Sequence, residues 1–470
     1  MIEASSTSPR AQAPAPAVNA SGSPLARALR NAAWLLGGKG AGGLFSLFYL
    51  ALAARSLGVT GFGVFATILA YGQAFASLVT FQSWQAIVHY GMKHLAAGRA
   101  GRIHRLIRCT VTLDIAAAAL GTVIAVAGMR FFGASFGWTT EEVDLGTWFL
   151  LSLLLGQRGT ATGILRLADR FDRAAAAELA QPALRLTGAA IAFAMHGGVG
   201  AFLLAWVAAD FGCTLCLWLV AGRSLRGLCP TGDPDRGKSA RAENPGIVRF
   251  MLATNVSASL GLVWQQLPVL AVGWFTGPAG AGIYRLAAQL GTALIKPVAT
   301  LARAVYPEFA RVAAEASPAS LAPLMRRTTA VTGLFAVVAL AVAAAGGRPL
   351  LDLVGGPAYG AAYPVFLLLT VASAIGLTGF GLEPALVAAG RPWAAFAARA
   401  GASGLYLLLI LLIVPTGGAI GMAWAAIGAT IASVALLKIA FARAMADRGN
   451  GPPAAPNGDC GAIVTEAATR

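Results

Sequence analysis

The stretch AARSLGVTGFGVF (53–65) contains three glycines spaced as GxxGxG between two long apolar runs, and GPAGAGIY (277–284) repeats that spacing 219 positions later. Other segments recur at nearly the same separation: LRLADRF (165–171) with LVAAGRP (386–392), and GGVGAFLLAWVAA (197–209) with GGAIGMAWAAIGA (417–429). A near-constant offset of about 220 residues indicates that one structural unit occurs twice in the chain. This duplication decides the predicted fold.

Composition indicates a membrane protein. Of the 470 residues, 57% are hydrophobic and only 11% are charged, and the mean hydropathy is +0.71, whereas soluble domains carry about 25% charged residues. The unbroken apolar runs are about 20 residues or longer, which is the length of a membrane-spanning helix rather than of a barrel strand. We therefore expect an α-helical integral membrane protein.

Twelve apolar runs are expected to form transmembrane helices, near residues 31–54, 64–88, 107–129, 144–165, 177–196, 199–222, 248–275, 284–305, 328–347, 361–389, 397–415 and 418–442. Because each copy of the repeat holds six runs, an even number, both copies enter the membrane from the same side. This predicts an all-α protein with two parallel six-helix lobes around a central cavity. The expected organisation is a disordered tail (1–26), a first lobe (27–226), a linker (227–247), a second lobe (248–446) and a second disordered tail (447–470).

The distribution of basic residues predicts the orientation. If both termini are cytoplasmic, 27 of the 35 Lys and Arg residues fall in cytoplasmic segments, and only Arg55, Arg130 and Arg348 fall in outer loops. Lys and Arg are enriched in cytoplasmic loops of membrane proteins. The net charge of +16 is then explained by topology, and no nucleic-acid partner is expected.

The glycine repeats are predicted to be turns and not phosphate-binding loops. A phosphate loop follows a buried strand and opens a soluble helix, whereas each of these loops joins two membrane helices, where glycine permits a tight turn. The CxxC of Cys213 and Cys216 lies in an apolar run without a second ligand pair, so it is predicted to pack between helices. Neither a cofactor nor a metal is expected.

Charged residues inside the predicted helices are the candidate site. A charged side chain at a helix centre costs roughly 2.5–3.5 kcal/mol on insertion scales. The basic candidates for a cavity that binds an anionic substrate are Lys39, Arg158, Arg185, Arg285 and Lys296. Alternatively, these cations pair with Asp114, Asp210 and Glu383 and fix helix packing. The three acidic residues are also candidates for proton or sodium coupling.

Several segments resemble those of bacterial polysaccharide-biosynthesis exporters. They are NAAWLLGGKGAGGLFSLFYLALAARSLGVTGFGVF (31–65), GILRLADRFDRAA (163–175), LARAVYPEFARVAAE (301–315) and GAAYPVFLLL (360–369). The resemblance covers residues 27–446. The chain is identified by it as a member of the oligosaccharide flippases of the multidrug/oligosaccharidyl-lipid/polysaccharide exporter superfamily.

The resemblance implies a flippase and not an enzyme. Such a protein translocates a polyprenyl-pyrophosphate-linked oligosaccharide across the bacterial inner membrane by alternating access, for lipopolysaccharide O-antigen, capsule or exopolysaccharide synthesis. It also implies a basic lumen, and as partners H⁺ or Na⁺, a polysaccharide polymerase and a chain-length regulator.

Two other functions remain open. A small-molecule antiporter like the MATE transporters would favour an acidic, aromatic cavity, and the surplus of basic residues argues against it. A membrane polymerase or ligase would need a large outer loop with catalytic groups. The longest predicted outer loop, RFFGASFGWTTEEV (130–143), offers few such groups.

Overall fold

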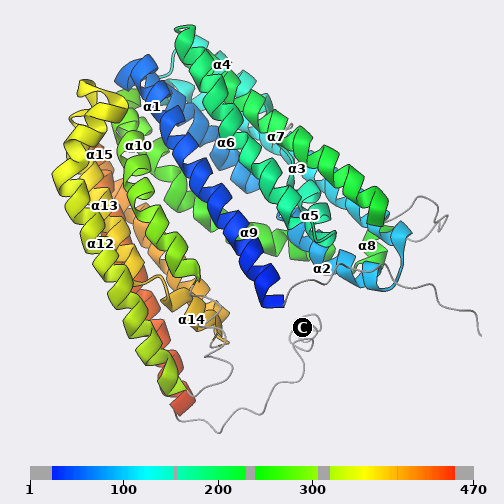
Figure 1. Cartoon of the computed structure of the whole chain (residues 1–470). Helices are drawn as coiled ribbons and strands as arrows, with labels where there is room; N and C mark the ends of the chain where they lie inside the picture. Colours follow the sequence, from blue (N-terminus) through cyan, green and yellow to red (C-terminus); the bar gives the residue numbers. More distant parts are fainter. Residues whose placement is uncertain (1–23, 153–155, 229–238, 305–317, 389, 450–470) are drawn as a thin grey trace, which may run out of the picture.

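The computed structural model describes residues 24–152, 156–228, 239–304, 318–388 and 390–449 (Figure 1). Within these ranges only the backbone is described for residues 24–41, 228, 256–258, 260, 297–304, 318–328, 331, 388 and 446–449. The predicted disordered tails, apart from their innermost residues, and positions 229–238 of the predicted linker lie outside the described residues.

The described residues form helices and contain no strand. The first half of the chain contains α1 (Pro24–Val79), α2 (Ser83–Ala96), α3 (Ala100–Phe132), the 3₁₀ turn η1 (Gly133–Phe136), α4 (Thr140–Leu151), α5 (Gly159–Leu167), α6 (Phe171–Ala194) and α7 (Val199–Leu228). The short α8 (Ala240–Glu243) follows. The second half contains α9 (Ile247–Gln265), α10 (Leu267–Ala304), α12 (Pro318–Gly355), the 3₁₀ turn η3 (Pro357–Tyr359), α13 (Ala362–Thr378), α14 (Leu382–Ala388) and α15 (Pro392–Gly449).

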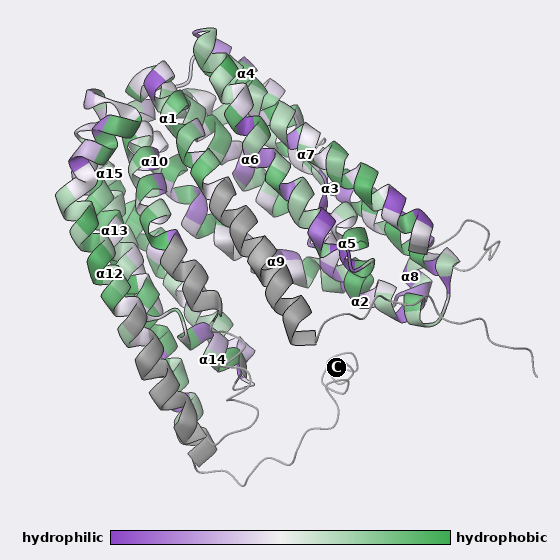
Figure 2. Cartoon of the chain, in the orientation of Figure 1, coloured by the Kyte–Doolittle hydropathy of each residue, from purple (hydrophilic) through white to green (hydrophobic). Residues whose placement is uncertain are grey.

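Six helical segments of the described residues are long and apolar enough to cross a membrane: 42–96, 100–136, 199–227, 332–355, 362–387 and 392–445. Their outward faces are apolar (Figure 2). Leu120 on α3 and Leu411 on α15, for example, expose 63% and 65% of their surface. An apolar exterior of this extent is stable only in lipid. The chain is therefore a multi-pass membrane protein.

Three of the long helices contain a glycine with non-helical backbone angles, which divides each of them into two limbs. These residues are Gly58 in α1 (φ 64°), Gly277 in α10 (φ 75°) and Gly418 in α15 (φ 53°). Glycine adopts positive φ without the steric cost that a Cβ brings. Gly58 and Gly277 are the first glycines of the two GxxGxG motifs, so the predicted tight turns are confirmed. The total of twelve spans stays a prediction.

The third glycines of the two motifs bring the halves together. A Cβ on Gly63 would lie 1.7 Å from the carbonyl oxygen of Pro278, and a Cβ on Gly282 would lie 2.4 Å from the carbonyl oxygen of Val59. Both spacings, Val59 to Pro278 and Gly63 to Gly282, equal the 219-residue offset of the repeat. The two turns therefore pack against each other reciprocally, and only glycine allows this close backbone approach.

Hydrogen bonds reinforce this contact. The Arg55 guanidinium donates to the carbonyl oxygen of Leu353 (2.5 Å), at the end of α12, and the Tyr359 hydroxyl donates to that of Gly58 (3.2 Å). A cation at a helix C-terminus is also favoured by the helix dipole. From this end, the helices of the two halves diverge toward the end where α1 begins and α15 ends (Figure 1).

Four runs that were predicted to be single helices are interrupted. The run 64–88 breaks at residues 80–82, the run 144–165 is interrupted between α4 and α5, the run 361–389 breaks at 379–381, and the run 248–275 breaks at Gln266, between α9 and α10. The second and third breaks contain GQRG (156–159) and GFG (379–381), in which glycine disfavours helix. Hydrophobicity alone did not distinguish these half-helices from continuous spans.

The end of the linker docks on the first half. Arg105 on α3 donates two hydrogen bonds to the Glu243 carboxylate (2.7 and 3.0 Å), and His94 on α2 contacts the Asn244 side chain (2.9 Å). The Arg105 hydrogen bonds hold the pKa of the Glu243 carboxyl below its ordinary value of 4.5. These contacts fix where the chain enters α9.

Candidate functional site

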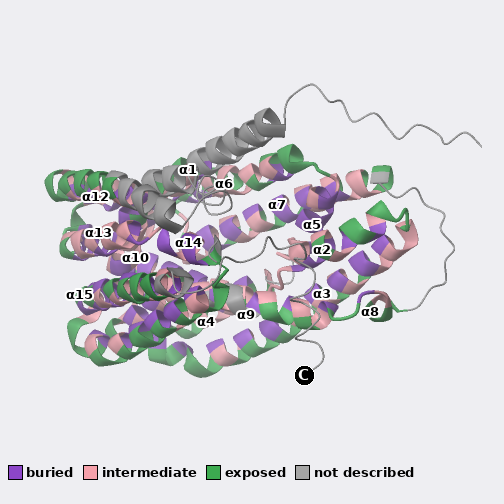
Figure 3. Ribbon diagram, turned by 90° about the horizontal axis from the view of Figure 1, so that it is seen from below, coloured by how far each residue is buried: buried purple, intermediate pink, exposed green. Residues whose placement is uncertain are grey.

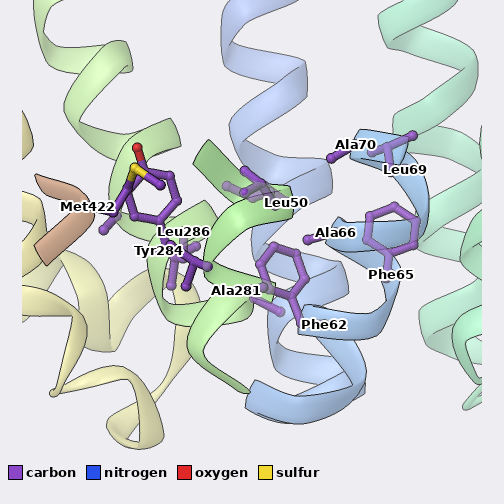
Figure 4. Packing of buried hydrophobic residues seen from close by; sticks show 14 of the residues in the cluster. Leu50, Phe62, Phe65, Ala66, Leu69, Ala70, Ala281, Tyr284, Leu286 and Met422 are labelled. Atoms are coloured by element: carbon purple, nitrogen blue, oxygen red, sulfur yellow. The ribbon is translucent and has the colours of Figure 1, made fainter. Parts of the chain in front are cut away.

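A cavity of about 110 Å³ lies between the two halves, where α1 and α10 pack against each other. Buried hydrophobic residues pack where these two helices meet, and Figure 4 shows Phe62 of α1 beside Ala281 of α10. The lining residues come from α1, α6, α7 and α10, and they are Ser46, Tyr49, Leu50, Phe62, Phe65, Ala66, Leu69, Arg185, Trp206, Arg285 and Gln289. Two of the five basic residues singled out from the sequence, Arg185 on α6 and Arg285 on α10, therefore reach one cavity from opposite halves.

Arg185 is held in place by contacts within the first half. Its guanidinium donates to the Asp210 carboxylate (2.7 Å) and lies over the Trp206 ring, 3.4 Å from the ring centroid. Gln181, one turn before Arg185 on α6, also donates to Asp210. Trp206 and Asp210 are four residues apart on α7 and thus lie on the same helix face. Asp210 compensates the charge of Arg185, and Trp206 fixes the plane of its guanidinium.

Arg285, in contrast to Arg185, has no polar partner among the described residues. Within the described parts of the chain it forms neither a hydrogen bond nor an ion pair. The Tyr49 hydroxyl and the Arg185 Nε, which belong to residues of the same cavity lining, are buried without a hydrogen-bond partner among the described residues. Unpaired buried polar groups are costly. The cavity has room for a few water molecules, so these groups face a polar space that carries one uncompensated positive charge.

The similarity of the chain to known proteins agrees with this architecture. The family described as "Polysaccharide biosynthesis protein" matches residues 28–313, more than half of the chain. The chain belongs to this family. The family predicted from the sequence is thereby confirmed.

One curated protein and two solved structures extend the comparison. The inner membrane protein YghQ of Escherichia coli (strain K12) is 28% identical over 340 residues, which cover 71% of this chain and 94% of YghQ. An inward-facing multidrug resistance MATE family transporter of the MOP superfamily has a TM-score of 0.68 at 14% identity, with 87% of this chain and 96% of that one covered. Lipid II flippase MurJ in an inward closed conformation has a TM-score of 0.65 at 11% sequence identity. The match covers 86% of this chain and 88% of the MurJ chain. The chain has the all-helical MOP fold.

Arg158 and Lys296, two of the other basic candidates, lie outside the lining of the 110 Å³ cavity. Arg158 approaches Asp210 (3.7 Å) and donates to the Cys213 sulfur (3.3 Å), so it belongs to the helix packing around Asp210. Lys296 is exposed on α10, and its Nζ lies 3.8 Å from where a Cβ on Gly43 of α1 would be. It is eleven residues, about three turns, after Arg285 and lies on the same side of α10. The side chain of Lys39 lies outside the described residues.

The three acidic candidates have different environments. Asp210 is paired with Arg185. Glu383 is paired with Arg399, and the Arg399 Nη1 lies 3.3 Å from the Glu383 carboxylate. Asp114 on α3 is 3% exposed, and the described residues provide no cation for it. Of the three, only Asp114 is therefore a buried carboxylate without a positive partner among these residues.

The Asp114 carboxylate lies at the beginnings of two half-helices. It accepts hydrogen bonds from the hydroxyls of Ser83, the first residue of α2, and Thr160, the second residue of α5 (2.9 Å). Thr160 also lies 3.1 Å from the Thr110 hydroxyl. Helix N-termini favour negative charge. The two helix breaks thus place hydroxyl donors and helix dipoles around one buried carboxylate, and the sequence singled out Asp114 but not these partners.

The sequence did not predict the aromatic residues of the site. Tyr49 and Trp206 belong to apolar runs in which aromatic side chains are most often packing residues. A usable signal was the spacing of Trp206 and Asp210, because a ring and a carboxylate on one helix face can together hold a guanidinium.

Proposed function

We propose that this protein is a flippase that carries a polyprenyl-diphosphate-linked oligosaccharide across the bacterial inner membrane by alternating access, in surface polysaccharide synthesis. Membership of the polysaccharide biosynthesis family supports the class of substrate, and the name of the relative YghQ supports the inner membrane. The single observation that carries the proposal is the convergence of Arg185 and Arg285 on one cavity between the halves. Cytoplasmic termini, a polymerase and a chain-length regulator remain predictions.

The chemistry of the cavity suits a diphosphate. A guanidinium offers several N–H donors in a planar arrangement that matches phosphate oxygens. Arg285 retains its full charge toward the cavity, whereas Arg185 is already oriented by Asp210 and Trp206. The Tyr49 hydroxyl is available as an additional neutral donor. Since the cavity holds only about 110 Å³, the halves must move apart to admit a complete substrate.

The same geometry disfavours an antiporter of organic cations. Such a substrate would need a carboxylate free to face the cavity. Asp210, the acidic candidate nearest this cavity, is engaged by Arg185, Arg158 and Gln181. The described lining residues otherwise contribute positive or neutral groups.

We assign ion coupling to Asp114. A carboxylate buried in a membrane bundle without a cation partner is costly in the charged form, so binding of H⁺ or Na⁺ there lowers its free energy. Its hydroxyl neighbours come from α2 and α5, the half-helices that begin at breaks. Occupancy of the site can therefore change how these half-helices pack.

Equilibrium binding of bare polyprenyl diphosphate to the protein in lipid nanodiscs tests the flippase proposal. Arg285→Gln should weaken binding roughly 10- to 100-fold, because charge-assisted hydrogen bonds are worth about 1.5–3 kcal/mol. Arg285→Lys, which keeps the charge but not the fork of donors, should be intermediate. Arg130→Gln, on an exposed residue paired with Asp144, is the control and should bind normally. Normal binding by Arg285→Gln would refute the proposal.

A further inference from the structure

A second and larger cavity lies within the second half of the protein. It has a volume of about 660 Å³ and is lined by residues of α9, α10, α13, α14 and α15. Its volume falls in the range of pockets that bind small organic molecules. None of the four basic candidates whose side chains are described lines it, and of the acidic candidates only Glu383 does. This cavity is therefore separate from the cationic site proposed for the diphosphate, and its ligand has to be inferred from its own lining residues.

Aromatic rings form one wall of this cavity, near the middle of the second half. Trp264 on α9 and Tyr406 on α15 pack with ring centroids 4.7 Å apart at 31°, and Tyr284 on α10 also lines the space. The Trp264 indole donates to the Ser403 hydroxyl (2.9 Å), and the Tyr406 hydroxyl contacts the Met422 sulfur (3.7 Å). These bonds fix the rings before any ligand binds.

Hydroxyl groups line the rest of the cavity. Ser373 on α13 and Ser433 on α15 form no hydrogen bond with any described residue, so both donate and accept freely. Thr292 and Thr430 donate to carbonyl oxygens of their own helices (2.7 Å each) and retain acceptor capacity. The polar groups of the lining thus offer both donors and acceptors.

The charges in this cavity cancel. Glu383 and Arg399 form an ion pair toward the end where α15 finishes, and each side chain is 45% exposed. The described residues of the lining contain no other acidic or basic side chain. An organic cation or an acidic group would find no unpaired counter-charge here, in contrast to the space in front of Arg285.

We propose that this cavity binds the saccharide portion of the substrate, and that it selects uncharged sugars. The inference rests on the proposed function, since it assigns a second part of the same substrate to a second place. A sugar ring presents apolar C–H faces, which pack on aromatic rings, and hydroxyls, which pair with Ser and Thr. A polyprenyl chain would use the aromatic wall but would leave the Ser373 and Ser433 hydroxyls unpaired at a cost.

The helix α10 borders both cavities, so one substrate with two chemically different parts can contact both of them. Arg285 and Gln289 line the cavity between the halves, whereas Tyr284, Ala288 and Thr292 line the larger cavity. Two faces of one helix therefore border the proposed diphosphate and saccharide sites.

Binding of paired probes tests the inference. The probes are bare polyprenyl diphosphate, the same lipid carrying one neutral disaccharide, and that disaccharide as the free methyl glycoside. In the wild-type protein, the disaccharide should increase lipid affinity. Trp264→Leu and the double variant Ser373→Ala/Ser433→Ala should each lower the affinity for the disaccharide-carrying lipid about tenfold, which corresponds to the loss of about 1.4 kcal/mol of aromatic or hydroxyl contacts.

The outcomes separate the two proposals. Neither cavity variant should change binding of the bare lipid, whereas Arg285→Gln should weaken binding of both lipids. Trp148→Leu, which alters an exposed tryptophan on α4 (73% exposed), is the matched control. A disaccharide that adds no affinity, or variants that weaken the bare lipid equally, would overturn the saccharide site. If no polyprenyl diphosphate binds, the proposed function fails, and Trp264-dependent binding of the free glycoside still decides the saccharide site.

Discussion

Tyr284 and Arg285 are consecutive residues of α10, yet they line different cavities. Successive residues of a helix are rotated by about 100°, so Tyr284 faces the interior of the second half and Arg285 faces the first half. The helix is thus a shared wall between an uncharged, aromatic space and a positively charged one. A movement of α10 would change both spaces together.

The Tyr49 hydroxyl is expected to serve binding at the expense of stability. Because it is buried without a partner among the described residues, Tyr49→Phe should leave thermal stability unchanged or raise it by about 1 kcal/mol. The same change should lower affinity for polyprenyl diphosphate severalfold. Thermal unfolding and equilibrium binding measured on one preparation check both effects. A variant that is destabilised and binds normally would show that the hydroxyl is structural.

Asp114→Asn is expected to uncouple transport from the ion gradient. The amide is nearly isosteric. Its oxygen still accepts from one of the Ser83 and Thr160 hydroxyls, which bind different oxygens of the carboxylate, and its NH₂ group can donate to the other, but the amide neither takes up a proton nor carries a charge that attracts a cation. Flipping of a fluorescent lipid-linked saccharide in proteoliposomes should therefore continue at equilibrium but lose its response to an imposed H⁺ or Na⁺ gradient. Asp172→Asn, on an exposed residue of α6, is the control. A full gradient response in the Asp114 variant would exclude this role.

Gly282→Val is expected to prevent close contact between the two glycine turns. A Cβ at this position would lie 2.4 Å from the Val59 carbonyl oxygen, so the halves must separate at this end. Spin labels at Thr60 and Thr276, in a background without native cysteines, should report a longer distance than in the parent. Gly404→Val is a suitable control because a Cβ there meets no atom within 4 Å. An unchanged distance in Gly282→Val would contradict the packing.

The Glu243 contact predicts a pH dependence of stability. Its pKa is lowered in the folded protein, so the stabilisation is present above the ordinary pKa of 4.5 and is lost as the pH falls through the folded value. The melting temperature of wild type should therefore fall on acidification below about pH 4.5 more steeply than that of Glu243→Gln. Glu141→Gln, on an exposed residue of α4, should follow wild type. Parallel pH profiles for Glu243→Gln and wild type would refute the assignment.

The sequence was most informative where a pattern reports directly on the backbone. Apolar run length identified the membrane class, and the repeated glycines located the turns at Gly58 and Gly277. The breaks beside Ser83 and Gly159 were missed because a half-helix in a protein interior is as apolar as a continuous span. Which residues of an apolar run are buried and which are exposed can be seen only in the folded arrangement (Figure 3).

For the site, the sequence identified charges but not their partners. Arg158, Arg185 and Arg285 were equivalent as isolated cations in apolar runs. Their different surroundings depend on Asp210, which lies on another helix and engages two of the three. The aromatic wall at Trp264 and Tyr406 was not recognisable, because the sequence does not tell a ring that lines a cavity from one that fills the core.

The reciprocal contact of Gly63 with the Pro278 turn and of Gly282 with the Val59 turn has an evolutionary implication. Equivalent residues of the two copies meet around a local twofold axis, which is the arrangement of an isologous homodimer interface. A single copy of the repeated unit, carrying one GxxGxG turn, would be self-complementary at this surface. The association of the two copies thus required no new interface after gene fusion, and later divergence was free to place the uncompensated Arg285 where the copies meet and a neutral pocket inside the second one.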